Sequence, residues 1–149
     1  MTALWALREG ISEAQNFEGP SLKYDVTVPV SSIDAFVERT DRALQAAVPG
    51  IRIVTYGHIG DGNLHYNLSK REGSAHDAFR GRAGDLARVV YDSVRSFDGS
   101  ISPEHGLGQS KAGMIGDYKD SYELQLMRGV KELFDPARLR NPGKVLPNA

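Results

Sequence analysis

Two runs of alternating residues around a glycine-rich turn constrain the fold of this chain most strongly. They form the segment IRIVTYGHIGDGNLHYNLS, residues 51–69. Such alternation is typical of strands with one buried face, and Asp61-Gly62 is a strong signal for a two-residue hairpin turn. With that turn, His58 would lie directly opposite His65. The segment therefore predicts an antiparallel hairpin with two facing imidazoles.

The alternation also predicts which hairpin residues are buried. The apolar face, expected to pack beneath helices, gathers Ile51, Ile53, Ile59, Leu64, Tyr66 and Leu68. The polar face gathers Tyr56, His58, Asn63, His65 and Asn67. Directly opposed Cβ atoms in such a pair lie about 4.5–5.5 Å apart, close enough for two imidazoles to bind one metal ion. One histidine alone would be read as solvated surface, but two facing histidines predict a site.

Periodicity elsewhere in the chain predicts the remaining elements. The expected helices are residues 2–15, 33–48, 75–97 and 121–134, and the other expected strands are residues 22–28 and, more briefly, 100–102. The resulting order is helix, β-α-β-β-α-β, helix, which is typical of an α+β fold. We expect a ferredoxin-like split β-α-β antiparallel sheet, with helices on one face and additional terminal helices.

The two terminal helices carry apolar stripes that need a surface to pack against. In the first helix the stripe is Leu4, Leu7, Ile11 and Ala14. In the last helix the residues expected to point inward are Tyr122, Leu126, Val130 and Leu133. Beyond that helix, the tail DPARLRNPGKVLPNA is too rich in proline for regular structure.

Composition limits the chemistry that the chain can perform. Its 149 residues suit one domain, and its formal net charge of -1 gives no general attraction to nucleic acid or to anionic membrane. No apolar run approaches the roughly 20 residues of a transmembrane segment. The chain has no cysteine, so any metal site must use histidine and carboxylate ligands. The lack of cysteine also fits a cytoplasmic location.

A second motif, SPEHGLG over residues 102–108, offers the missing ligand. The carboxylate of Glu104 would complete a His₂Glu set, which leaves a coordination position open for water or substrate. The neighbouring His105 would then be free to act as a general base. Taken alone, this loop is more simply an exposed surface loop. Arg8 and Lys23 are likewise ordinary surface cations unless an anionic substrate is bound.

These motifs, together with LREGISEA, GPSLKYDVTVPV and DPARLRNPGKVLP, resemble the C-terminal region of FAD-linked 2-hydroxyacid oxidoreductases. That family includes D-lactate dehydrogenases, the glycolate oxidase flavin subunit and D-2-hydroxyglutarate dehydrogenases. The resemblance runs in order over nearly the whole chain. It implies that residues 1–149 form a single domain, the substrate- and metal-binding cap of a larger flavoenzyme. The FAD-binding domain is absent from this chain and would be supplied in cis or as a separate chain.

The resemblance also implies a role for individual residues. The metal ligands would be His58, His65 and Glu104, with zinc as the usual ion. The substrate-binding residues would be Arg8, Ser12, Lys23, Asn67 and His105. Of these, His105 takes the place of the catalytic base, which removes the substrate hydroxyl proton while hydride leaves for FAD. A less specific correspondence places Asn141 and Lys144 on the flavin side, as cofactor-binding residues.

The resemblance therefore predicts an enzyme that oxidises a small D-2-hydroxy acid to a 2-oxo acid, with these 149 residues inactive by themselves. The location would be cytoplasmic, or peripheral to a membrane through the full-length enzyme, and a homodimer is a further expectation. Two other hypotheses stay open. One is a stand-alone divalent-metal-binding domain or metal-dependent hydrolase that uses His58, His65 and Glu104. The other is a catalytically silent module that drives association through an exposed surface.

Overall fold

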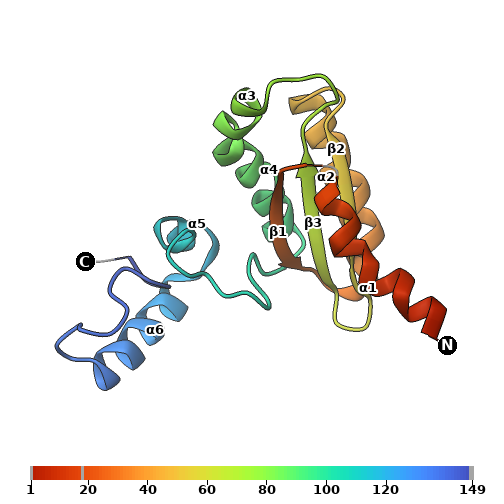
Figure 1. The fold of residues 1–149 in the computed structure, drawn as a ribbon. Coiled ribbons are helices and arrows are strands. Elements are labelled where there is room, and N and C mark those ends of the chain that lie inside the picture. Colours follow the sequence, from red (N-terminus) through yellow and green to blue (C-terminus); the bar gives the residue numbers. More distant parts are fainter. Residues whose placement is uncertain (1, 18, 148–149) are drawn as a thin grey trace.

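A computed structural model describes residues 2–17 and 19–147, apart from the side chains of Thr2, Ser12 and Asn16. Its helices are α1 (Thr2–Phe17), α2 (Ile33–Ala47), α3 (His76–Gly81), α4 (Ala83–Ser96), α5 (Ile115–Tyr118) and α6 (Ser121–Phe134), with short 3-10 turns η1 (Val30–Ser32) and η2 (Ala112–Met114). Its strands are β1 (Ser21–Thr27), β2 (Arg52–His58) and β3 (Asn63–Ser69). The predicted α+β class is confirmed (Figure 1).

The three strands form one antiparallel sheet in the order β1-β3-β2. The fourth strand expected at residues 100–102 is reduced to a single bridge between Ser100 and Thr27, with both N–H···O distances at 2.9 Å. The ladder does not continue to Ser102, because the backbone N–H of Ser102 donates to the Ser100 hydroxyl, at 3.4 Å, instead of to β1. The chain therefore leaves the sheet and enters the loop of residues 102–108.

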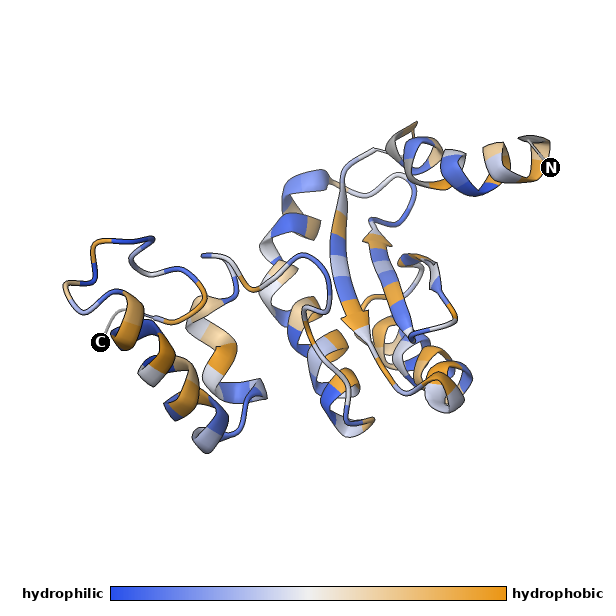
Figure 2. Cartoon of the chain, turned by 90° about the horizontal axis from the view of Figure 1, so that it is seen from below, coloured by the Kyte–Doolittle hydropathy of each residue, from blue (hydrophilic) through white to orange (hydrophobic). Residues whose placement is uncertain are grey.

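Helices α2 and α4 cover the apolar face of the sheet, as expected. Fully buried residues from both helices and from the strands form the core, among them Val26, Phe36, Leu44, Tyr66, Leu68, Leu86, Val90 and Val94. The two helices also meet through a buried hydrogen bond of 2.6 Å between the hydroxyls of Thr40 and Ser93. Helix α1 lies on the opposite, polar face of the sheet (Figures 1 and 2).

The single helix expected over residues 75–97 is wrong, because the chain breaks it at Arg82. Helix α3 ends at Gly81 and α4 begins at Ala83. Glycine inside a helix costs about 1 kcal/mol relative to alanine, and Gly81 stands at the break. The Arg82 guanidinium then donates a hydrogen bond of 2.9 Å to the Ala47 carbonyl at the end of α2. This bond ties the break between α3 and α4 to the end of α2, in the same helical layer.

The expectation that the stripe of the last helix points inward is wrong. Its members Tyr122, Leu126, Val130 and Leu133 are 52–76% exposed, and Leu124 is the buried residue of α6. Figure 2 shows the hydrophobic positions along this helix, which lies beside the C-terminal tail. The stripe of α1 is exposed as well. Within the described residues, no helix has both the length and the apolar character needed to cross a bilayer.

A buried aspartate fixes the tail against α6. Asp135 accepts hydrogen bonds from the backbone N–H groups of Leu139 and Arg140, both at 2.9 Å, and from Lys131 Nζ at 2.5 Å. The bond from Lys131 and the two backbone bonds hold the pKa of Asp135 below its ordinary value of 3.8, against the opposing effect of burial. The tail has no regular structure, as predicted, but it is anchored at its first turn.

The lowered pKa of Asp135 predicts how stability depends on pH. A carboxylate whose pKa is depressed by folding stabilises the folded state above its unfolded pKa, and that contribution disappears as the pH falls through the folded value. We expect wild type to exceed Asp135→Asn in free energy of unfolding by a constant margin down to about pH 5, and by a shrinking margin below about pH 4. Urea denaturation of both proteins across this range measures the margin. A margin that stays unchanged in acid would contradict the assignment.

Candidate metal and substrate site

The hairpin that carries the two histidines has a longer turn than predicted. Residues 59–62 form the turn, and His58 lies opposite Asn63 instead of His65. The His58 carbonyl accepts hydrogen bonds from the backbone N–H groups of Asp61 and Gly62, at 3.3 and 3.1 Å. The Asp61 carboxylate also accepts the N–H of Asn63 at 3.0 Å. These bonds close a four-residue turn, so the predicted two-residue turn is wrong.

Gly62 ties this turn to the end of β1. Its carbonyl accepts the N–H of Val28 at 3.2 Å, and its φ of +74° lies in the left-handed region. A Cβ atom at this position would lie only 2.0 Å from the Val28 carbonyl oxygen. Only glycine fits both requirements. A tertiary contact with β1 therefore determines the turn length.

The two histidines nevertheless share the polar face of the sheet. The observed pairing differs from the predicted one by two residues, and side chains in a strand alternate with a period of two, so the face of each residue is unchanged. His58 and His65 are now diagonal neighbours, with ring centroids 5.9 Å apart. Ile59, expected in the core, lies in the turn and is 78% exposed.

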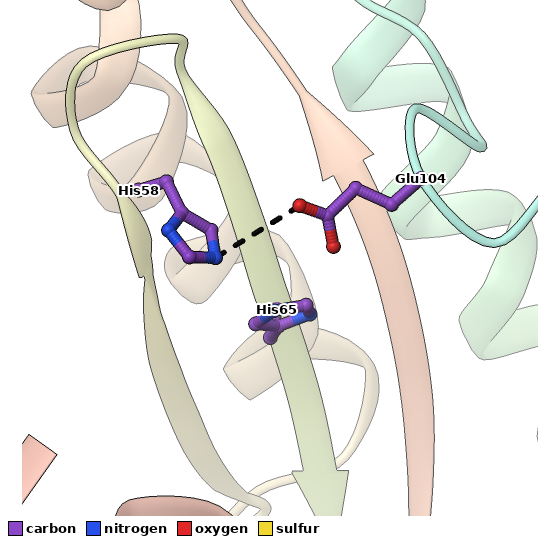
Figure 3. Close-up of side chains that lie close together, drawn as sticks. All are labelled: His58, His65 and Glu104. Atoms are coloured by element: carbon purple, nitrogen blue, oxygen red, sulfur yellow. Dashed lines mark ion pairs between the residues drawn. The ribbon is translucent and has the colours of Figure 1, made fainter. Parts of the chain in front are cut away.

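Glu104 joins the two histidines from the loop of residues 102–108. His58 Nε2 and Glu104 Oε1 are 3.9 Å apart, and one ligand atom from each of the three residues lies within 4.8 Å of the others (Figure 3). In a tetrahedral site with bonds of 2.0–2.1 Å, ligand atoms are about 3.3 Å apart, so a small inward movement of side chains would suffice. Two imidazoles and a carboxylate are a donor set that fits a divalent metal ion.

Asp25 lies beneath this cluster, and the sequence reasoning did not single it out. It pairs with His65 across the β1–β3 ladder and is only 4% exposed. Its carboxylate accepts the Nδ2–H of Asn63 at 2.8 Å and the backbone N–H groups of Glu104 and His105, both at 2.9 Å. Burial by itself raises the pKa of Asp25, but these hydrogen bonds outweigh it and hold the pKa below its ordinary value. The one signal in the sequence was its place on the polar side of β1.

His105 stands beside the three candidate metal ligands without joining their group. Its ring stacks on that of His65, with centroids 5.9 Å apart and an interplanar angle of 19°. Its Nδ1 atom is 3.8 Å from Asp25 Oδ2, while the side chain is 67% exposed. The imidazole therefore lies open to solvent beside the candidate ligand group.

The residues predicted to bind substrate are partly gathered around the same face. Arg8 Nη2, from α1, is 3.4 Å from His58 Nδ1, and both residues line a hollow of about 330 Å³. Asn67 is buried and donates a hydrogen bond of 2.8 Å to Gln15 of α1. Lys23 is exposed and pairs with Asn67 across the ladder, so it shares the polar face. The side chain of Ser12 lies outside the described residues.

The two predicted cofactor-binding residues lie elsewhere. Asn141 and Lys144 line a separate pocket with residues of α6, in the part of the chain that Figure 1 shows away from the β2–β3 hairpin. The structure therefore does not bring them to the candidate metal ligands. Gln15, which the sequence reasoning missed, is buried at the site and holds the Asn67 amide. Its helical spacing gave no sign of this contact.

Comparison with known proteins identifies the family of the chain. The family of FAD linked oxidases, C-terminal domain, matches residues 1–145. The chain belongs to this family. The resemblance inferred from the motifs is thus confirmed.

Several curated relatives of the chain carry one name. D-2-hydroxyglutarate dehydrogenase of Xanthomonas citri pv. viticola is 41% identical over 142 residues, which are 95% of the chain and 30% of the relative. The mitochondrial D-2-hydroxyglutarate dehydrogenase of Danio rerio is 40% identical over 146 residues, 98% of the chain and 26% of the relative. That of Arabidopsis thaliana is 38% identical over 148 residues, 99% of the chain and 25% of the relative. The chain thus spans less than a third of the length of each of these relatives.

Proposed function

We propose that this chain is the substrate- and metal-binding domain of an FAD-dependent dehydrogenase that oxidises a D-2-hydroxy acid to a 2-oxo acid. The observation that carries the proposal is the convergence of His58, His65 and Glu104, with His105 stacked beside them. The names of the relatives favour D-2-hydroxyglutarate as the substrate. Because the chain covers a fraction of each relative, an FAD-binding domain would act with it, in cis or as a separate chain.

The proposed roles follow from the chemistry of the side chains. His58, His65 and Glu104 would hold a divalent ion, with zinc as the first choice. When bound, this ion supplies Lewis-acid polarisation of the substrate oxygens, and FAD supplies the acceptor for the hydride from C2. His105 would accept the hydroxyl proton as the C2 carbonyl forms. Its exposed imidazole and its place beside the ligand set support this role.

Cationic side chains would orient the anionic substrate. Arg8 reaches the ligand set from α1, and Lys23 lies on the same polar face from β1. A guanidinium and an ammonium group suit the two carboxylates of a dicarboxylic hydroxy acid. Holding the two substrate carboxylates would direct the C2–H bond toward the flavin, and such positioning contributes to the reaction rate. Asn67 is proposed as a further substrate contact, and Ser12, Asn141 and Lys144 stay predictions.

Flavin reduction tests the proposed function. In anaerobic solution, D-2-hydroxyglutarate should bleach the visible absorbance of FAD when the chain is assembled with its FAD-binding domain, and the L-enantiomer should not. The chain alone should be colourless and should not oxidise the substrate. Persistence of the flavin band with every D-2-hydroxy acid tried would contradict the proposal, and metal-dependent ester hydrolysis without flavin would favour the hydrolase hypothesis. A homodimer and a cytoplasmic location stay predictions, since some relatives are named mitochondrial.

A further inference from the structure

We propose that Asp25 is a positioning residue for both Glu104 and His105. Its buried carboxylate would hold the loop of residues 102–108 against β1, so that two consecutive side chains lie beside the histidines of the hairpin. The inference rests on the proposed function for the roles of Glu104 and His105. Its structural part, the hold of Asp25 on the loop, is testable without any metal or flavin.

The hydrogen bonds of Asp25 connect the segments that carry the proposed ligands. Oδ2 accepts the N–H groups of Glu104 and His105, and Oδ1 accepts the side-chain amide of Asn63. Asn63 is the ladder partner of His58 in β2, and Asp25 itself is the partner of His65 in β3. The Asp25 carboxylate therefore contacts the loop of residues 102–108 directly. Asp25 also pairs with His65 and is linked to His58 through its ladder partner Asn63.

The bond to two adjacent N–H groups sets the direction of the loop backbone. A single oxygen can accept from consecutive residues only when their N–H groups converge, which is a concave arrangement of the backbone. The chain then turns at Gly106, whose φ is +69°. The Ser102 hydroxyl closes this turn by donating to the Gly106 carbonyl at 2.5 Å. With the backbone fixed in this way, Glu104 approaches His58 while His105 stacks on His65.

The geometry favours a positioning role for Asp25 over a role as a fourth ligand. Its two oxygens already accept three N–H groups, and its side chain is nearly inaccessible to solvent. The group of ligand atoms found within 4.8 Å of one another consists of His58, His65 and Glu104. Residues that orient metal ligands in this indirect way typically change metal affinity by about 10- to 100-fold when they are removed.

Two substitutions at Asp25 test the inference in the full chain. Asp25→Ala should remove the protection of the Glu104 and His105 amides from hydrogen exchange, while the amides of β3 stay protected. Zn²⁺ affinity, measured by titration calorimetry, should fall by about 10- to 100-fold. Asp25→Asn keeps an oxygen for both N–H groups, and rotation of the Asn63 amide would offer its Oδ1, which has no donor in this structure, to the new amide. This variant should keep the loop amides protected and lose less than about tenfold in affinity.

Asp135→Ala is the matched control. Asp135 is also a buried aspartate that accepts two consecutive backbone N–H groups, but it acts in the tail beside α6. Its removal should lower stability and leave Zn²⁺ affinity unchanged. This comparison separates a general loss of stability from a displaced ligand.

The possible results separate failure of the proposed metal site from failure of the proposed role of Asp25. If wild type binds no Zn²⁺, the proposed metal site is wrong, while hydrogen exchange still decides whether Asp25 holds the loop. If Asp25→Ala keeps both amides protected and its Zn²⁺ affinity, the inference is overturned. If Asp25→Ala does not fold, Asp25→Asn decides. In that case, an Asp25→Asn protein with protected loop amides and retained Zn²⁺ affinity supports the positioning role. An Asp25→Asn protein with protected loop amides and a loss of Zn²⁺ affinity as large as that of Glu104→Ala overturns it.

Discussion

Replacing His65 with alanine is expected to lower the affinity of the chain for Zn²⁺ by about 100-fold or more. Structural zinc sites contribute roughly 10–16 kcal/mol of binding free energy, so each of three or four ligands accounts for several kcal/mol. His65 lies in the central strand of the sheet, between β1 and β2, and one of its ring nitrogens belongs to the candidate ligand group. Titration calorimetry of wild type and variant gives the change directly.

A matched histidine elsewhere in the chain provides the control for this measurement. His76 is the first residue of α3 and does not belong to the ligand group. His76→Ala should bind Zn²⁺ as wild type does, with one ion per chain. Equal losses in the two variants would show that binding depends on histidine content instead of on the cluster. An unchanged affinity in His65→Ala would remove the metal from the proposed function.

The polar face of the sheet and its two histidines were predictable from sequence because strand alternation has a period of two. The predicted register was wrong by two residues, yet His58 and His65 stayed on one face. The turn length was not predictable, because it depends on the docking of Gly62 against Val28, residues that are distant in sequence. Local pattern therefore predicted the face of each residue, and a tertiary contact decided which residues are directly opposed.

The role of Asp25 was hidden from the sequence for a related reason. An aspartate on the polar side of a strand is ordinarily solvated, and only the packing of a loop 79 residues away buries this one. The apolar stripe of α6 illustrates the same limit. Periodicity indicated correctly which residues share a face of the helix, but it could not indicate whether the chain itself supplies a surface to cover that face.

Replacing His105 with glutamine is expected to lower kcat for oxidation of a D-2-hydroxy acid by about 10²- to 10⁴-fold, the usual contribution of a general base. The substitution keeps the backbone N–H that Asp25 accepts, so the loop and Glu104 should stay in place. Zn²⁺ affinity should therefore match that of wild type, and KM should change little. Stopped-flow measurement of flavin reduction, in the chain assembled with its FAD-binding domain, isolates this step.

Glu104→Gln distinguishes loss of a base from loss of a ligand. Its carboxylate belongs to the ligand group, whereas the His105 imidazole lies beside that group and open to solvent. Glu104→Gln should therefore lower Zn²⁺ affinity and flavin reduction together, while His105→Gln should lower flavin reduction alone. A His105→Gln enzyme that reduces flavin at the wild-type rate would exclude His105 as the base. A parallel loss of Zn²⁺ in that variant would contradict the assignment of His105 as a base that does not take part in holding the ion.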